Sequence, residues 1–326
     1  MRENRGAVRW ARIAVTALVT AWTVVAVPFE HAVADPMWTM PFFVDPTTSG
    51  AVAAKQASPP KPELDLIAAT PQAWWVDQQT SVGAAAKAIK SHVAAAAAAG
   101  SMPIVTVYGI PHRDCGGFAS GGMSSGSQYR EWIGELVKGV HSVPVTVIVE
   151  PDALASVDCL SPDQRAERMT LLRVAVEAFA ADSNAVVYID GGHSRWLSPE
   201  ELATRLREAG VDKARGFSLN VSNFFSTEEQ AAYGERVSAL LGGAHYVIDT
   251  SRNGLGPAPD EPMNWCNPPG RALGSAPTTR TGYPRADAYL WIKRPGESDG
   301  DCGRGDPQSG LFVVDYAVQL VRNRPR

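Results

Sequence analysis

The chain has 326 residues, of which 45% are hydrophobic, and a formal net charge of −4 at pH 7. This composition can supply one sizeable core and is typical of a globular protein. The charge balance shows no basic excess, which argues against nucleic acid as a partner.

The first 34 residues have the pattern of a secretory signal peptide. Arginines at positions 2, 5, 9 and 12 precede an apolar run over 13–27, and the sequence AVA at 32–34 forms a cleavage site of small residues. We therefore expect a signal peptide at 1–34 and a single secreted domain at 35–326, free of the membrane after cleavage. An uncleaved anchor is the alternative, because the apolar run approaches the length of a short membrane span.

Cysteine usage agrees with export. The four cysteines show no C-x-x-C pair and no histidine pair at zinc spacing, and they are Cys115, Cys159, Cys266 and Cys302. In an exported protein this pattern favours two structural disulfides over a metal site. Three pairings are possible, and the spacing does not choose among them. We expect no metal and no cofactor.

A β-rich apolar run, a polar turn and a helical stretch recur along the chain. The predicted strands are PFFVDP near position 42, PIVTVYG, VPVTVIVEPD, NAVVYIDGG, ARGFSLNVSN, AHYVIDTSRNG and AYLWIKRPGESDG. Between them, SVGAAAKAIKSHVAAAAAAG predicts a helix that stops at Gly100, and two further helices begin with a serine cap followed by proline, at Ser161 and Ser198. The segment QASPPKPELDL near position 60 is proline-rich and short, the aromatic stretch QAWWVD follows it, and we assign this proline-rich segment to a loop within the domain.

Strands that alternate with helices predict a parallel sheet with right-handed crossovers. The strands are nearly continuous in Val and Ile, which indicates burial on both faces. We predict an α/β fold, a distorted, incompletely closed (β/α) barrel of about seven parallel strands that is similar to a TIM barrel. An open doubly wound sheet is the alternative, and both folds place a site at the carboxyl ends of the strands.

Acidic residues gather in the turns that follow the predicted strands, and they are Asp114, Asp152, Asp190, Glu297 and Asp299. One aspartate in such a turn is usually a helix cap or a turn former. Several that converge on one rim cannot all ionise freely, so at least one is expected to keep its proton near neutral pH. Such a set supplies a general acid and a general base. Asp249, in VIDTSRNG, is instead assigned a structural role.

Aromatic side chains interleave with these acids, and they are Trp75, Tyr108, Trp196, Trp265 and Trp291. A flat apolar face beside hydrogen-bonding groups suits a sugar ring. Core packing is the ordinary role of a tryptophan. Because Trp196 and Trp265 lie in polar turns, the pattern favours sugar stacking for these two.

The segment GGMSSG at 121–126 matches the G-x-S-x-G pattern of an esterase around Ser124. That motif requires a strand directly before the serine, whereas the preceding CGGFASG is a glycine-rich loop. We interpret this loop, which carries Ser120, as a lid over the substrate.

Seven segments occur in order between about position 39 and the end of the chain: VYGIPHRDCGG, IVEPDAL, YIDGGHSRW, NVSNF, VIDTSRNGLGP, NWCNPPGRALG and WIKRPGESDG. In composition and order they resemble glycoside hydrolase family six, the inverting cellulases. The resemblance implies that Asp152 is the general acid and that the charge of Asp190 keeps it protonated. Asp299 matches a proposed catalytic base, with a water relay to Asp114 as the rival.

Further site residues are implied by the same resemblance. Ser120 joins Asp114 in holding the attacking water, and Tyr108 crowds the scissile ring. The implied substrate-binding residues are Trp75, His193, Trp196, Asn223, Trp265, Lys293 and Glu297. The implied disulfides are Cys115–Cys159 and Cys266–Cys302. Gly109 and His112 depart from the family pattern, which has Asn and Gly there.

The resemblance also implies a secreted, monomeric β-1,4-glucanase that acts with inversion on cello-oligosaccharides or β-1,4-glucan. The stretches after Asp190 and after Trp265 are short, which favours an open groove and internal cleavage. The sequence shows no cellulose-binding module, so soluble or amorphous glucan is the expected substrate. The alternatives are an exo-acting cellobiohydrolase and a carbohydrate-binding protein on a disabled hydrolase scaffold, and the complete set of acids argues against the second.

Overall fold

The structure is a computed structural model that describes residues 39–325. The expected signal peptide, 1–34, lies outside the described residues. Among the helices of 39–325, none has both the length and the apolar character that a membrane span needs.

Seven parallel strands form one sheet in the order β1 to β7, so each strand pairs with its neighbours in the sequence. The strands are β1 (Trp74–Asp77), β2 (Ile104–Tyr108), β3 (Val145–Val149), β4 (Ala185–Asp190), β5 (Gly216–Leu219), β6 (His245–Asp249) and β7 (Ala286–Leu290). A doubly wound sheet reverses its strand order partway, so the continuous order excludes that alternative. Within 39–325, β1 and β7 form no ladder with each other. The predicted, incompletely closed barrel is confirmed.

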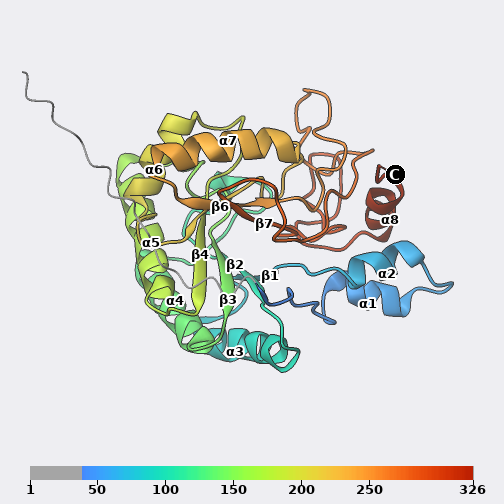
Figure 1. The fold of residues 1–326 in the computed structure, drawn as a ribbon, viewed down its shortest axis with the longest axis horizontal. Helices are drawn as coiled ribbons and strands as arrows, with labels where there is room; N and C mark the ends of the chain where they lie inside the picture. The colour runs from blue at the N-terminus through green and yellow to red at the C-terminus, as the bar shows by residue number, and fades with distance from the viewer. Residues whose placement is uncertain (1–38, 326) are drawn as a thin grey trace, which may run out of the picture. The chain divides into compact units, whose positions relative to one another are not determined.

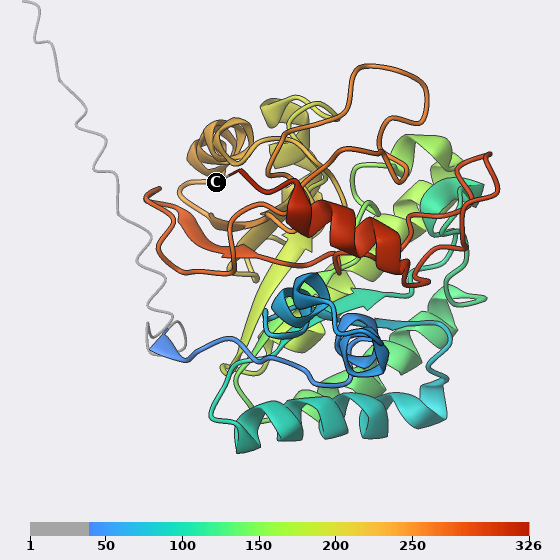
Figure 2. The ribbon, with the colours of Figure 1, turned by 90° about the vertical axis from the view of Figure 1, so that its right-hand side faces the viewer.

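Helices follow the strands and cover the outer face of the sheet (Figure 1). The helices after β1 to β5 are α3 (Val82–Ala98), α4 (Gly126–Val140), α5 (Pro162–Ala180), α6 (Pro199–Glu208) and α7 (Thr227–Leu240). Two short helices, α1 (Ser49–Gln56) and α2 (Pro62–Ala68), precede the sheet. The C-terminal α8 (Val314–Arg322) packs beside α2 (Figure 2).

Local sequence determines where α5 and α6 begin. The Ser161 hydroxyl accepts a hydrogen bond from the amide of Gln164, whose side chain accepts one from the amide of Ser161. Ser198 caps α6 by accepting from the amide of Glu201 (3.1 Å). Proline follows each cap, where its missing N–H leaves no hydrogen bond unmade. The predicted starts of both helices are confirmed.

Apolar side chains pack against both faces of the sheet, because successive residues of a strand point to opposite faces. On the outer face, Val107 and Phe217 belong to one buried cluster with Trp132 of α4. The other face carries a second buried cluster that includes Ile148 and Val247. The barrel is therefore a packed core, and polar groups gather at its rim.

The prediction of the first strand was wrong. In PFFVDP only Phe42 pairs, through an isolated bridge to Met102. Pro41 and Pro46, the first and last residues of this segment, lack the N–H that a ladder needs. The first strand is instead Trp74–Asp77, within the aromatic stretch QAWWVD, and its whole length pairs with β2. The loop assignment of QASPPKPELDL was also wrong in part, because α2 begins at Pro62 within it.

Candidate active site

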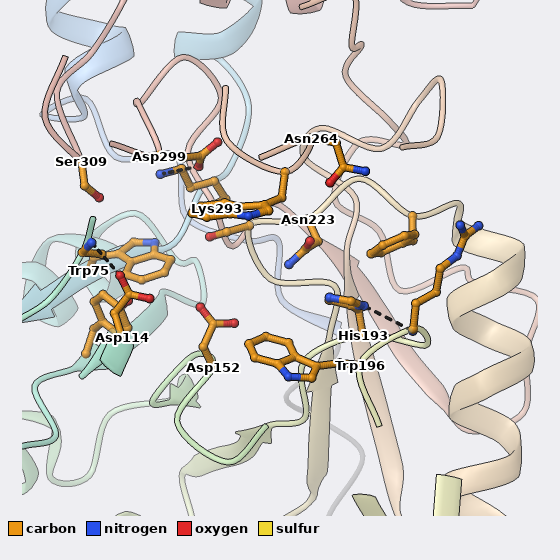
Figure 3. A pocket seen from close by; sticks show the side chains of 16 residues that line it. Trp75, Asp114, Asp152, His193, Trp196, Asn223, Asn264, Lys293, Asp299 and Ser309 are labelled. Atoms are coloured by element: carbon orange, nitrogen blue, oxygen red, sulfur yellow. Dashed lines mark hydrogen bonds and ion pairs between the residues drawn. The ribbon is translucent and has the colours of Figure 1, made fainter. Parts of the chain in front are cut away.

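The carboxyl ends of the strands surround a cavity of about 470 Å³ (Figure 3). Ten of the residues singled out from the sequence line it: Trp75, Tyr108, Asp114, Asp152, His193, Trp196, Asn223, Trp265, Lys293 and Asp299. They come from segments far apart in the chain. The parallel topology brings them together, because the carboxyl ends of all the strands meet at one rim.

Asp152 and Asp190 form a pair after β3 and at the end of β4. The amide of Asp152 donates a hydrogen bond to Oδ1 of Asp190 (2.9 Å), which also accepts from the amide of Gly192 (3.0 Å). The hydroxyl of Ser218 donates to Oδ2 (3.0 Å). Asp190 is fully buried, whereas the side chain of Asp152 points into the cavity (Figure 3).

The surroundings of this pair decide which carboxyl group keeps a proton. Burial, and then the charge of Asp190, raise the pKa of Asp152 well above its ordinary value. Burial also raises the pKa of Asp190 to about 7, against three hydrogen bonds that favour its ionised form. Within residues 39–325 no hydrogen bond is donated to the carboxyl of Asp152. The proton of the pair therefore resides on Asp152.

Asp114 lies on the turn after β2, beside Tyr108. The amide of Ala119 donates to its Oδ2 (2.7 Å). Burial raises the pKa of Asp114, and the hydrogen bond from Ala119 and the charge of Arg113 oppose the shift. The Tyr108 ring meets Trp75 edge-on, with 5.1 Å between centroids. Asp114 is thus a partly buried carboxylate that faces the cavity and can bind a water molecule.

Asp299 lies across the cavity from Asp152 in an ion-paired network (Figure 3). Its Oδ2 accepts from Nη1 of Arg252 (2.8 Å) and from the amide of Asn267 (3.0 Å), and Nζ of Lys293 lies 3.4 Å from Oδ1. Burial opposes ionisation, but the charges of Arg252 and Lys293 outweigh it and hold the pKa of Asp299 below its usual range. Asp299 is therefore ionised and weakly basic.

Aromatic rings line the cavity walls. Trp196 is 40% exposed and Trp265 is 42% exposed, which leaves their faces accessible to a ligand. The His193 ring contacts Phe225, with 4.4 Å between centroids, and Trp196, at 5.4 Å. Burial lowers the pKa of His193 to about 4, so this side chain is neutral at pH 7. These rings suit the apolar face of a sugar.

Two residues implied by the family resemblance do not line the cavity. Ala119 lines the wall where Ser120 was expected, and Ser120 is exposed, with its amide bonded to the carbonyl of Gly117 (3.1 Å). Glu297 accepts hydrogen bonds from Ser49 (2.7 Å) and Arg294 (3.3 Å) outside the cavity. Its contacts point to a role in holding α1 against the β7 side of the barrel.

Trp291 and Asp249 are part of the framework. Trp291 is 1% exposed and its indole N–H donates to the carbonyl of Ser275 (2.9 Å), so it packs in the core and does not interleave with the acids as expected. The buried carboxylate of Asp249 accepts from the amides of Ser251 (2.9 Å) and Lys293 (2.8 Å). Asp249 therefore orients the turn that carries Lys293, in agreement with its assigned structural role.

Ser124 does not form a nucleophile elbow. It is exposed, it follows a loop, and its hydroxyl donates to Oε1 of Gln128 (2.8 Å) in the first turn of α4. An esterase serine needs a preceding strand and an adjacent base. The observed surroundings instead make Ser124 part of the start of a helix.

Sequence reasoning missed three residues near the site. Arg252 is fully buried beneath Asp299, and Glu150 is fully buried two positions before Asp152. Phe118 lies 6.2 Å from Trp265 between ring centroids, so the loop after Asp114 reaches the loop that carries Trp265. Only Glu150 gave a sequence signal, as a carboxylate at the end of an apolar strand.

The disulfides hold the loops that carry site residues. Cys115 pairs with Cys159, and Cys266 pairs with Cys302. This is the pairing that the family resemblance implies. The first bond lies directly after Asp114 and the second directly after Trp265, so each restrains a cavity-lining residue.

The arrangement can perform acid and base chemistry. The protonated carboxyl group of Asp152 can act as an acid, and the carboxylate of Asp114, which can bind a water molecule, can act as a base. Across the described residues, no group of three or more His, Cys, Asp or Glu side chains is arranged to hold a metal ion. Carboxyl groups that face each other across a sugar-binding cleft are the means by which most glycoside hydrolases cleave their substrates.

The fold and the site together place the chain among the glycoside hydrolases. Within that class, residues 35–324 match the family model of glycosyl hydrolases family 6. The chain belongs to this family.

Individual relatives agree with the family assignment. The endoglucanase Cel6 from Mycobacterium tuberculosis, solved in complex with methyl-cellobiosyl-4-deoxy-4-thio-β-D-cellobioside, has a TM-score of 0.88 and 58% identity, covering 89% of this chain and 99% of that one. Endoglucanase A from Cellulomonas fimi is 42% identical over 290 residues, and endoglucanase A from Thermobispora bispora is 44% identical over 291. The alignments cover 88% and 87% of this chain, which spans 62% of the length of each of those two proteins.

Proposed function

We propose that this chain is a secreted endo-β-1,4-glucanase that hydrolyses cellulose or related β-glucan with inversion. One observation carries the proposal: the proton-holding Asp152 points into a cavity that exposed tryptophans line and that ionised Asp299 faces from the other side. The endoglucanase relatives support the substrate class. The signal-peptide pattern at 1–34 supports export of a single catalytic domain, 35–326.

In the proposed mechanism Asp152 is the general acid. It donates its proton to the glycosidic oxygen as the bond to the anomeric carbon breaks. Burial, and then the charge of Asp190, raise the pKa of Asp152 and keep the proton available at neutral pH. Tyr108 lies beside this position and crowds the sugar ring whose bond is cleaved.

We assign the base function to Asp114, acting through water. Both oxygens of Asp299 are engaged by cations, which makes this carboxylate a poor proton acceptor. Asp114 has a raised pKa and only one of its oxygens accepts from the protein, so it is the better acceptor. Inversion needs a water on the far side of the ring, with carboxyl groups about 6.5–9.5 Å apart. Asp299 then stabilises positive charge that develops on the sugar.

Sugar rings bind through stacking and hydrogen bonds. Trp196 and Trp265 line the cavity and are partly exposed, and Asn223 and Lys293 line the same cavity with polar groups. A single chain supplies all of these residues, so we propose that the active form is a monomer.

Product analysis tests the proposal against its two alternatives. The purified protein is incubated with cellohexaose and with amorphous cellulose, and the products are separated by chromatography over time. An endoglucanase releases a range of oligosaccharides from early times, together with a rapid loss of polymer length. Cellobiose as the dominant early product would indicate exo action, and binding without cleavage would indicate a carbohydrate-binding protein.

A further inference from the structure

The side chain of Glu150 accepts hydrogen bonds from the turn that follows β2 and from α4. It is fully buried at the end of β3. The amide of Gly109 lies 3.0 Å from both of its carboxylate oxygens, and the amide of Ile110 donates to Oε2 (3.1 Å). The hydroxyl of Tyr129, on α4, donates to Oε1 (2.9 Å). Every partner is a donor, so the contacts fit the ionised carboxylate.

The side chain of Arg168, on α5, makes the complementary contacts. It is 2% exposed, and its guanidinium donates to the carbonyls of Pro111 and His112 (both 2.8 Å) and of Ala153 (3.0 Å). Pro111 and His112 lie on the turn after β2, and Ala153 lies on the turn after β3. One buried cation therefore joins the two turns through their backbone oxygens.

The joined turns carry the two groups on which the proposed chemistry depends. The β2 turn begins after Tyr108 and leads to Asp114, and the β3 turn carries Asp152. The backbone φ is +51° at Glu150 and +66° at Asp152, a region that side-chain-bearing residues adopt at a cost. Buried polar groups that bond mainly to backbone can hold such a conformation, because leaving any of them unpaired is costly.

We propose that Glu150 and Arg168 form a buried clamp that sets the position of Asp152 relative to Asp114. This inference rests on the proposed hydrolase function. Both are positioning residues: neither lines the cavity, and each acts through the turns that it binds. Loosening the clamp changes the position of Asp152 relative to Asp114. The tryptophans that stack on the sugar stay in place.

The test compares kcat and KM on cellohexaose for the wild-type protein, Glu150→Gln and Tyr129→Phe. The amide of Gln cannot accept at both oxygen positions, so Glu150→Gln loses part of the contact with the β2 turn. Tyr129→Phe removes a single donor and keeps the ring, which preserves the fold. A misplacement near 1 Å can cost about 100-fold in rate, so we expect kcat to fall about 10- to 100-fold in Glu150→Gln. We expect a fall of about 3-fold in Tyr129→Phe, with KM unchanged in both.

A matched control separates positioning from general loss of stability. Leu64 is fully buried in the cluster between α2 and α8, away from the cavity. Leu64→Ala is expected to lower the melting temperature and leave kcat unchanged. Unchanged kcat in both Glu150→Gln and Tyr129→Phe would overturn the clamp. A similar loss of kcat in Leu64→Ala would also overturn it. If Glu150→Gln does not fold, the kcat of Tyr129→Phe alone tests the clamp, and an unchanged kcat in that variant overturns it. A wild-type protein without activity would overturn the proposed function and the clamp together, whereas active wild type with unaffected variants overturns only the clamp.

Discussion

The amide of Asp152 donates a hydrogen bond of 2.9 Å to the carboxylate of Asp190, which joins the two acids at the ends of neighbouring strands. Asp190 uses its oxygens to bind Asp152, Gly192 and Ser218, so it is the better stabilised anion of the pair. The proton consequently stays on the residue that faces the cavity. A fixed hydrogen bond through the backbone thereby assigns different chemical roles to two like residues.

The acid role of Asp152 predicts a loss of activity that depends on the leaving group. Asp152→Asn is expected to reduce kcat on cellohexaose by about 10²- to 10⁴-fold, because no proton reaches the departing oxygen. A dinitrophenyl cellobioside, whose leaving group needs no proton, should be cleaved at a much less reduced rate. Steady-state kinetics on both substrates makes the comparison, with the exposed Asp163→Asn as a control. Equal losses on the two substrates would contradict the assignment.

The charge of Asp190 predicts a shift in the pH profile. Asp190→Asn removes a negative charge that raises the pKa of Asp152, so Asp152 should lose its proton at a lower pH. The alkaline limb of the kcat/KM profile should then move down by about 1 pH unit. Activity measured from pH 4 to pH 9 tests this. An alkaline limb that stays in place would show that Asp190 does not control the protonation of the acid.

Periodicity and motif order predicted the later part of the barrel because its strands are long apolar runs bounded by turns. The strands from β2 to β6 lie within the predicted runs, and β7 begins at Ala286, just before the predicted run that starts at Ala288. The first strand was misplaced since Trp74–Asp77 has only four residues and follows a proline-rich stretch, whereas PFFVDP looks more strand-like. Its pairing is decided by tertiary contacts with β2, which no local pattern reveals.

Asp299 predicts a pH-dependent contribution to stability. Its pKa in the folded state lies below the ordinary value, so its ionisation stabilises the fold above the unfolded-state pKa, and this contribution is lost as pH falls through the folded pKa. Asp299→Asn leaves Arg252 buried without its anion, which should cost about 3–5 kcal/mol at pH 7. Denaturant unfolding at pH 7 and at pH 3 measures the difference between the two proteins. The difference should shrink at pH 3, and a difference that does not change with pH would refute the ion-pair account.

Two tryptophans should respond differently to removal. Trp265 is 42% exposed, so Trp265→Ala should weaken cellohexaose binding about tenfold, roughly 1.4 kcal/mol, with little loss of stability. Trp291 is 1% exposed, so Trp291→Ala should cost about 3–5 kcal/mol of stability. Calorimetry in an Asp152→Asn background measures binding without turnover, and denaturant unfolding measures stability. Unchanged binding in Trp265→Ala would show that Trp265 does not stack on the sugar.

The acids of the site were predictable because each follows a strand, and parallel strands end at one rim. The buried partner of Asp299 was not. Arg252 follows β6 in VIDTSRNG, yet its pairing with Asp299 joins positions 47 residues apart. Ser120 and Glu297 sit in matching motifs, but the turn at Gly117 and the contact with Ser49 direct them away from the cavity. Side-chain direction in a turn depends on backbone angles that motif matching does not supply.

Inversion is tested most directly by proton NMR of cellohexaose during hydrolysis, with the anomeric signal of the new reducing end followed from the first minutes. We predict early accumulation of the α-anomer, because water attacks from the face opposite the departing oxygen while Asp152 donates its proton. Initial accumulation of the β-anomer would show retention and contradict the proposed roles of Asp152 and Asp114.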